Sequence, residues 1–266
     1  MKHIILLTLL VLEVFASVMR APVLSINEEA QTLTIKIKKI DIGMSGFVVH
    51  PIAPNHSSIL KSVVVIDYDA LSEIATLQMN DFSTLRNNAL PTGQWKVEVG
   101  DGVELAFGYS RALLIAPSEE IYHRITKSVK IQWVHVDIFA TILSYNGHPT
   151  PLQSDFEAMS IASSVGLLFV YLDKKLYTID IKSFTILSIS DAPLAQDSVE
   201  LPFYSRIEHI EANWFGEGSD ELEDYESHYY ELLVQNNTKN AGLYEIIKNG
   251  DEKLQFLLEE FEIEEK

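Results

Sequence analysis

The pattern of the chain changes at residues 111–120, which have the sequence RALLIAPSEE. Ala112 to Ala116 form a continuous apolar run, which is typical of a strand covered on both faces. Pro117 and Ser118 then precede two acids, and this order predicts a helix from about Glu119 to Thr126 with Ser118 as its cap. A buried strand followed directly by a helix indicates a mixed α/β layer in the second part of the chain.

Before this stretch, polar and apolar residues alternate with a period of two, which predicts strands. The predicted strands cover residues 32–37, 47–50, 62–67, 74–79, 96–99 and 103–105. Pro51 should end the second of them, because proline cannot donate a hydrogen bond to a ladder. Gly100-Asp101-Gly102 predicts a β-turn, since a strand and not a helix follows it, which argues against a phosphate loop. This half is predicted to be a small antiparallel barrel or sandwich.

After residue 120, helices and strands both follow. Helices are predicted over residues 134–145 and 154–162, and a meander of strands over 167–172, 176–181 and 184–189. Towards the end, Asp220 is predicted to cap a helix that stops at residues 236–240, and a last helix is predicted from about Asp251. The chain is therefore predicted to be α+β. We divide it into a signal peptide (1–16), an antiparallel β subdomain (22–110), a mixed α/β subdomain (111–216) and an acidic helical C-terminal segment (217–266).

Composition narrows the classes of partner. The 266 residues carry a net charge of −18, which opposes binding to nucleic acid and to an anionic membrane surface. We find no cluster of lysine and arginine that would build a basic patch against this average. Cysteine is absent, which excludes thiolate nucleophiles, thiolate zinc sites and disulfides.

The N-terminus has the features of a secretory signal. Met1-Lys2-His3 is a short basic start, an apolar run follows from Ile4 to Leu12, and Ala16 ends a suitable cleavage sequence. The run is too short to span a bilayer, and no second run is long enough. A buried first strand or helix is the alternative, because Glu13 interrupts the apolar stretch, and a later cleavage at Ala21 is less attractive beside Pro22. The mature protein is therefore expected in the periplasm, secreted, or held at the cell surface or outer membrane, without an integral membrane span.

For each candidate catalytic or metal-binding group in the sequence, a structural role is the simpler explanation. His209-Ile210-Glu211 lacks the cysteine ligands of a zinc deaminase, and His135 and Asp137 are expected on opposed faces of a helix. His148 is expected in a loop, and the stretch 43–46 falls short of a nucleophile elbow. We predict no catalytic residue, no metal site and no cofactor. A dense aromatic group is expected mainly in the core, with an exposed interface as the alternative; it comprises Phe203, Tyr204, Trp214, Phe215, Tyr225, Tyr229 and Tyr230.

Most of the chain resembles the N-terminal domain family of bacterial plasminogen-binding surface proteins. The stretches that carry the resemblance keep the family's order and spacing: Gly46–Val49, Phe107–Pro117 with Glu120 and Tyr122, Ser164–Leu168, Leu176–Asp180 and Pro202–Glu208. The resemblance implies a cell-surface or envelope protein that binds host plasminogen through lysines. Because we find no catalytic combination of residues, we predict that the protein is not an enzyme.

One departure from the family concerns these lysines. The resemblance places them in a basic tail beyond this domain, whereas here the end is acidic and carries a single terminal Lys266. Plasminogen's kringles hold a lysine between acidic residues, a cation and aromatic walls, so Lys266 is the predicted plasminogen contact. Glu264 and Glu265 beside it would weaken this attraction. The alternative function is a structural or assembly component of the bacterial envelope, with other envelope proteins as partners and no plasminogen binding.

Overall fold

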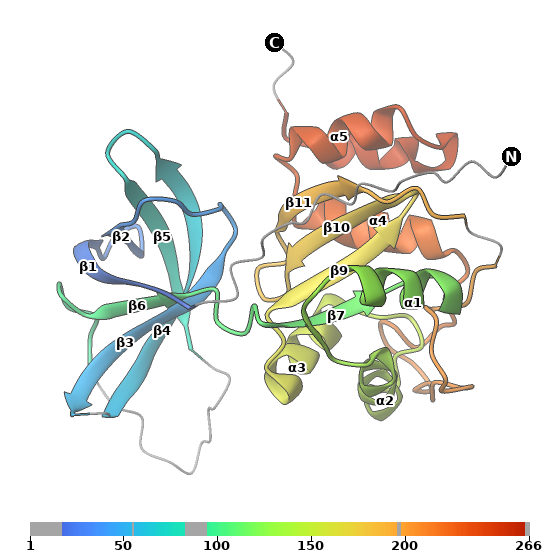
Figure 1. Ribbon diagram of the computed structural model, residues 1–266, viewed down its shortest axis with the longest axis horizontal. Coiled ribbons are helices and arrows are strands. Elements are labelled where there is room, and N and C mark those ends of the chain that lie inside the picture. Colours follow the sequence, from blue (N-terminus) through green and yellow to red (C-terminus); the bar gives the residue numbers. More distant parts are fainter. Residues whose placement is uncertain (1–17, 55, 83–94, 196–197, 264–266) are drawn as a thin grey trace, which may run out of the picture.

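The computed structural model describes residues 18–54, 56–82, 95–195 and 198–263. The predicted signal peptide and Lys266 lie outside these residues. Within them, a closed antiparallel barrel lies beside a five-stranded mixed sheet that is packed with helices (Figure 1). The predicted α+β class with an N-terminal barrel is confirmed, whereas the division of the chain at residues 110 and 216 stays a prediction.

The barrel contains six strands in the order β1-β2-β5-β4-β3-β6, and β1 closes it by pairing with β6. Its inner face follows from the alternation in the sequence, because successive side chains of a strand point to opposite sides. Leu33 and Ile35 are buried inside, whereas Thr32 and Thr34, which alternate with them, are partly exposed. The strands are β1 (Met19–Asn27), β2 (Thr32–Lys36), β3 (Ser45–Ala53), β4 (His56–Asp69), β5 (Ile74–Asp81) and β6 (Gly102–Leu105).

Two strand predictions in the barrel were wrong. Pro51 does not end β3, because the strand continues to Ala53 and takes up the proline with an irregular register beside it. Residues 96–99 do not form a strand. The Asp101 carboxylate accepts a hydrogen bond from the Glu98 backbone N–H at 2.8 Å, and this local turn replaces ladder bonds.

The second sheet has the strand order β11-β10-β9-β7-β8. β7 pairs parallel with both β8 and β9, and the predicted meander pairs antiparallel from β9 to β11. All residues of β9 are buried, as are the last four of β7, because both faces of these strands are covered. The strands are β7 (Arg111–Ile115), β8 (Gln132–Trp133), β9 (Leu167–Leu172), β10 (Lys175–Asp180) and β11 (Ile186–Asp191).

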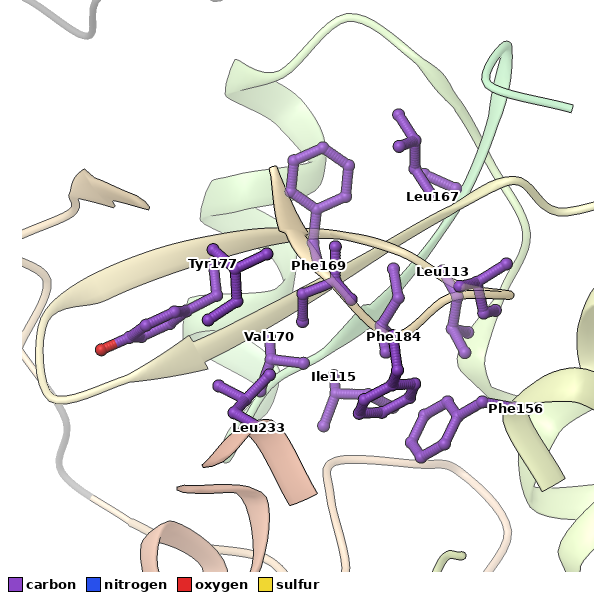
Figure 2. Close-up of a cluster of buried hydrophobic side chains, with 14 of the residues drawn as sticks. Leu113, Ile115, Phe156, Leu167, Phe169, Val170, Tyr177, Phe184 and Leu233 are labelled. Atoms are coloured by element: carbon purple, nitrogen blue, oxygen red, sulfur yellow. The ribbon is translucent and has the colours of Figure 1, made fainter. Parts of the chain in front are cut away.

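Helices pack against this sheet and complete its core. The Ser118 side chain caps the first of them, as predicted, and Phe156 and Phe184 meet with ring centroids 5.4 Å apart among side chains of β7, β9 and β10 (Figure 2). The helices are α1 (Glu119–Ser128), α2 (Val136–Asn146), α3 (Gln153–Ser163), α4 (Tyr225–Gln235), α5 (Ala241–Lys248) and the 3₁₀ helix η1 (Glu252–Glu260).

The predicted helices need four corrections. α2 begins two residues later than predicted, because the Val134 N–H bonds to Ala112 and prolongs the sheet. Asp224, not Asp220, caps α4, and it does so by accepting from the Ser227 N–H at 2.8 Å. Sequence reasoning missed α5, although Asn240 caps it. The last helix is 3₁₀, with buried Leu254 and Leu257 three residues apart, which matches three residues per turn.

A buried carboxylate joins the barrel to the sheet. One oxygen of Asp180 accepts from the Ser45 N–H and hydroxyl at 2.9 and 2.7 Å and from the Tyr109 hydroxyl at 2.7 Å. The other oxygen accepts from the backbone N–H groups of Lys182 and Ser183, both at 2.9 Å. Burial, with the nearby Asp180 charge, raises the pKa of Tyr109 well above its usual value, so the phenol remains a donor. These five bonds supply the hydrogen-bond partners that a buried carboxylate requires.

Candidate functional site

The stretches that resemble the family gather around β7 and the junction with the barrel. Gly108 and Gly166 come from two of these stretches, and the Gly166 N–H donates to the Gly108 carbonyl at 3.0 Å. A Cβ on Gly166 would lie 2.5 Å from the Gly108 carbonyl carbon and 2.7 Å from the Phe107 oxygen, so only glycine fits. These residues therefore form the frame that holds the barrel against the sheet.

A third stretch, Pro202–Glu208, crosses the carboxyl end of β7. The Tyr204 N–H donates to the Ala116 carbonyl at 2.8 Å, and Phe203 and Tyr204 are buried there. From β7 the chain runs through α1 to β8 on one side, and it then returns through α2 and α3 to β9 on the other side of β7. The carboxyl end of a strand at such a reversal is a position where α/β sheets often bind ligands. Here the chain's own aromatic side chains fill that position.

His135 and Asp137 have structural roles at the start of α2. His135 is the N-cap and accepts from the Asp137 N–H at 3.2 Å. The Asp137 carboxylate accepts from the Arg206 backbone N–H at 3.0 Å and from Arg206 Nε at 2.7 Å. Burial of Asp137 acts to raise the pKa of its carboxyl, but these bonds hold that pKa below its ordinary value. The pair therefore ties the Pro202–Glu208 stretch to α2.

The other sequence candidates are also explained by packing. His148 lies in a loop, as predicted, and its Nδ1 is 2.9 Å from the buried Asp155 carboxylate. Ser45 donates to Asp180 and is not exposed, whereas His209 and Glu211 lie at the surface. Across the described ranges, no group of three or more histidine and acidic side chains is placed to hold a metal ion.

One hollow lies between the β9–β10 turn and the start of α4. It has a volume of about 390 Å³ and mixes charges of both signs with an aromatic and aliphatic wall. Burial, with the nearby Asp173 charge, raises the pKa of the Glu226 carboxyl, and Lys253 lies 3.9 Å from it. Its lining residues are Tyr171, Asp173, Lys174, Leu194, Ser198, Val199 and Glu226.

A short basic turn follows β2 on the barrel. Lys36, Lys38 and Lys39 are exposed, and none of them forms an ion pair with another residue in the part of the chain that the structure describes. The backbone of this turn is fixed, because the Ile37 N–H donates to the Glu73 carbonyl at 2.9 Å and the Tyr68 hydroxyl donates to the Ile37 carbonyl at 3.2 Å. We call residues 36–39 the lysine turn.

Sequence reasoning missed the lysine turn. The residues Lys-Ile-Lys-Lys are a local basic signal in the sequence, although the net charge of the whole chain is −18. Lys36 also lies within the predicted strand of residues 32–37, in which polar and apolar residues alternate. The expectation that lysines form no local cluster was wrong at this turn.

The aromatic group splits into two sets. Phe203, Tyr204, Tyr225, Tyr229 and Tyr230 are buried, as expected for core residues. Trp214 and Phe215 are instead 99% and 87% exposed. The preference for the core is therefore confirmed for five of the seven and wrong for two.

Comparison with known proteins identifies the relatives of the chain. Two curated proteins from different strains of Helicobacter pylori, both named plasminogen-binding protein PgbA, are 26% identical to it over 200 residues. The match covers 74% of this chain and 43% of each relative, so the chain spans less than half the length of the curated relatives it matches. No solved structure matches. Among the described residues, no helix combines the length and apolar character needed to cross a bilayer.

A family model described as "Plasminogen-binding protein pgbA N-terminal" matches residues 18–233. The match begins just before β1 and ends in α4, so it includes the barrel, the sheet and the junction between them. Neither the family model nor these relatives indicate a catalytic family. The chain belongs to the family of the N-terminal region of plasminogen-binding protein PgbA.

Proposed function

We propose that this chain is an exported protein of the bacterial envelope or cell surface that binds plasminogen. The family match over residues 18–233 carries the proposal, because it extends over both the barrel and the sheet. The described residues offer exposed side chains rather than a reactive centre, which fits action by contact.

The position of β1 supports cleavage of the predicted signal after Ala16. β1 begins at Met19, and Met19 and Arg20 pair with Leu105 and Glu104 to close the barrel. Cleavage before Ala21 would remove both residues from this ladder, whereas cleavage after Ala16 leaves them in place. Fractionation with surface labelling of intact cells tests export; an unprocessed N-terminus on cytosolic protein would contradict it.

We assign plasminogen binding to lysine side chains. The ammonium group of Lys266 suits a pocket that holds a cation between acidic residues. The lysine turn offers three further ammonium groups on a fixed backbone, with no internal carboxylate partner among the described residues. A fixed backbone reduces the entropy lost when such side chains are bound.

Binding of plasminogen to the immobilised full chain tests the assignment. Deleting Lys266, and separately changing Lys36, Lys38 and Lys39 to glutamine, should each weaken binding, and free lysine should compete. The control is Lys127→Gln with Lys130→Gln, which removes two exposed lysines at another place. Equal losses in the control would indicate a general charge effect, and unchanged binding in both test variants would contradict the role of these lysines.

The alternative is a structural or assembly role in the envelope without plasminogen binding. The acidic C-terminal residues favour it, since 217–266 carry fifteen acids against four lysines. Co-purification with an envelope complex, and protection from protease added to intact cells, would support this alternative over the first proposal.

A further inference from the structure

We propose that the loop Asn213–Gly218, the aromatic tip, is a docking surface for a basic amphipathic helix of a partner protein. Trp214 and Phe215 are adjacent and are 99% and 87% exposed. Two neighbouring aromatic rings in solvent keep a large apolar area in water, and rings of this kind supply most of the binding energy when an interface covers them.

The tip is held in place at both of its ends. The Asn213 N–H donates to the Gly147 carbonyl at 3.0 Å, and its side-chain amide donates to the Asn146 carbonyl at 2.6 Å. At the other end, the Gly218 carbonyl accepts from the Thr150 N–H at 3.1 Å. The rings therefore extend from an anchored loop, and little ordering is needed before a partner binds.

A third ring lies on the helix that anchors the tip. Tyr145 is in the last turn of α2, directly before Asn146, and is 91% exposed. Because Asn213 bonds to this end of α2, the tip and Tyr145 belong to the same region of the surface.

The charge around the tip specifies a cationic partner. Residues 207–223 contain no lysine or arginine, and none of their six carboxylates forms an ion pair with another described residue: Glu208, Glu211, Glu217, Asp220, Glu221 and Glu223. Carboxylates around apolar side chains complement an apolar stripe flanked by lysines, which is the pattern of a basic amphipathic helix. A second copy of this chain fits poorly, because each copy carries a net charge of −18.

Fluorescence anisotropy tests the proposal with the full chain and a labelled synthetic helix of leucine and lysine, its leucines on one face. Wild type should bind this peptide, and Trp214→Ser with Phe215→Ser should weaken binding by about tenfold or more. Glu211→Gln with Glu217→Gln should weaken peptide binding less than the tip variant does. Added salt should reduce the difference in binding between this glutamine variant and wild type. Leu71→Ser is the matched control, because Leu71 is 97% exposed on the barrel, and it should bind like wild type.

Three results would overturn the proposal: no binding of the peptide to wild type, equal binding by the tip variant, or equal binding of a peptide with serine in place of leucine. Tip-dependent binding to phosphatidylcholine vesicles without binding to the peptide would assign the surface to lipid instead. Thermal unfolding verifies that the variants fold. Plasminogen binding through lysines should be the same in the tip variant and wild type, so the two proposals can fail separately.

Discussion

The barrel and the helix-packed sheet expose opposite chemistry. The barrel presents the lysine turn, with three ammonium groups in four residues, whereas the chain after β11 presents carboxylates around two exposed rings. In both regions these groups lie at the end of a strand or in segments between regular elements. The packed interiors are apolar apart from a few bonded polar groups such as Asp180. The comparison indicates that the family stretches maintain the frame, and we propose that the lysine turn and the aromatic tip carry recognition.

Asp180 tests whether the two regions form one cooperative unit. Asp180→Ala should lower the free energy of unfolding by roughly 3–5 kcal/mol, because it leaves donors of Ser45, Tyr109 and the following turn without an acceptor. Denaturant titration followed by both near- and far-ultraviolet circular dichroism measures the loss. Asp191→Asn is the control; its carboxylate pairs with Lys175 at the surface and should contribute under about 1 kcal/mol. A small loss for Asp180→Ala would mean that the regions do not depend on this junction.

Gly166 tests the frame on the sheet side of the junction. Gly166→Ala should cost about 1–3 kcal/mol, because the added methyl group meets backbone atoms of residues 107–109 that cannot move independently. Thermal unfolding measures the change. Gly242→Ala in α5 should cause no such loss, since its Cβ would meet only the Asn240 side chain at 3.3 Å. Equal effects of the two substitutions would contradict a special role for the glycine pair.

His228 predicts acid sensitivity in the helix-packed region. Burial lowers the pKa of its imidazole below 6.5, and the neutral ring donates from Nε2 to the Pro151 carbonyl at 2.9 Å. The unfolded chain therefore takes up a proton first as the pH falls through about 6.5. The contribution of neutral His228 to the free energy of unfolding is complete above that pH and is lost below it. His228→Gln keeps a donor without the titration. The fall in melting temperature between pH 7.5 and 5.5 should be smaller in this variant, and an identical fall would contradict the assignment.

The smallest expected effect on stability is that of changing the aromatic tip. Trp214→Ser with Phe215→Ser should change the free energy of unfolding by no more than about 0.5 kcal/mol, because both side chains are already in solvent. Calorimetry measures it. A loss above about 2 kcal/mol would show that the tip packs against the protein and is not a free surface.

Much of the fold could be predicted because its signals are local. Alternation over residues 32–37 and the apolar run of 112–116 identified strands, and Ser118 identified a helix start. The wrong predictions lie where a side chain bonds to the nearby backbone and changes the local structure. Asp101 bonds to Glu98 and prevents a strand, and Asp224 caps α4 in place of Asp220, one of several acids before that helix.

The exposed features could be predicted less well. Nothing in the sequence separates Trp214 from Tyr229, because exposure depends on which segments the tertiary fold covers. The role of Asp180 was also invisible, since its partner Ser45 is 135 residues away. The lysine turn does have a local signal, three lysines in four residues, which the net charge of the whole chain hides.

The most direct test is plasminogen binding by one combined variant, with Lys36, Lys38 and Lys39 changed to glutamine and Lys266 deleted. The account predicts that the wild-type chain binds plasminogen and that the variant binds more than about tenfold more weakly, because each missing ammonium removes a charged contact. Its melting temperature should remain close to that of wild type, since the side chains of Lys36, Lys38 and Lys39 are exposed. A folded variant that binds plasminogen as tightly as wild type, or a wild-type chain that does not bind it, would contradict the account.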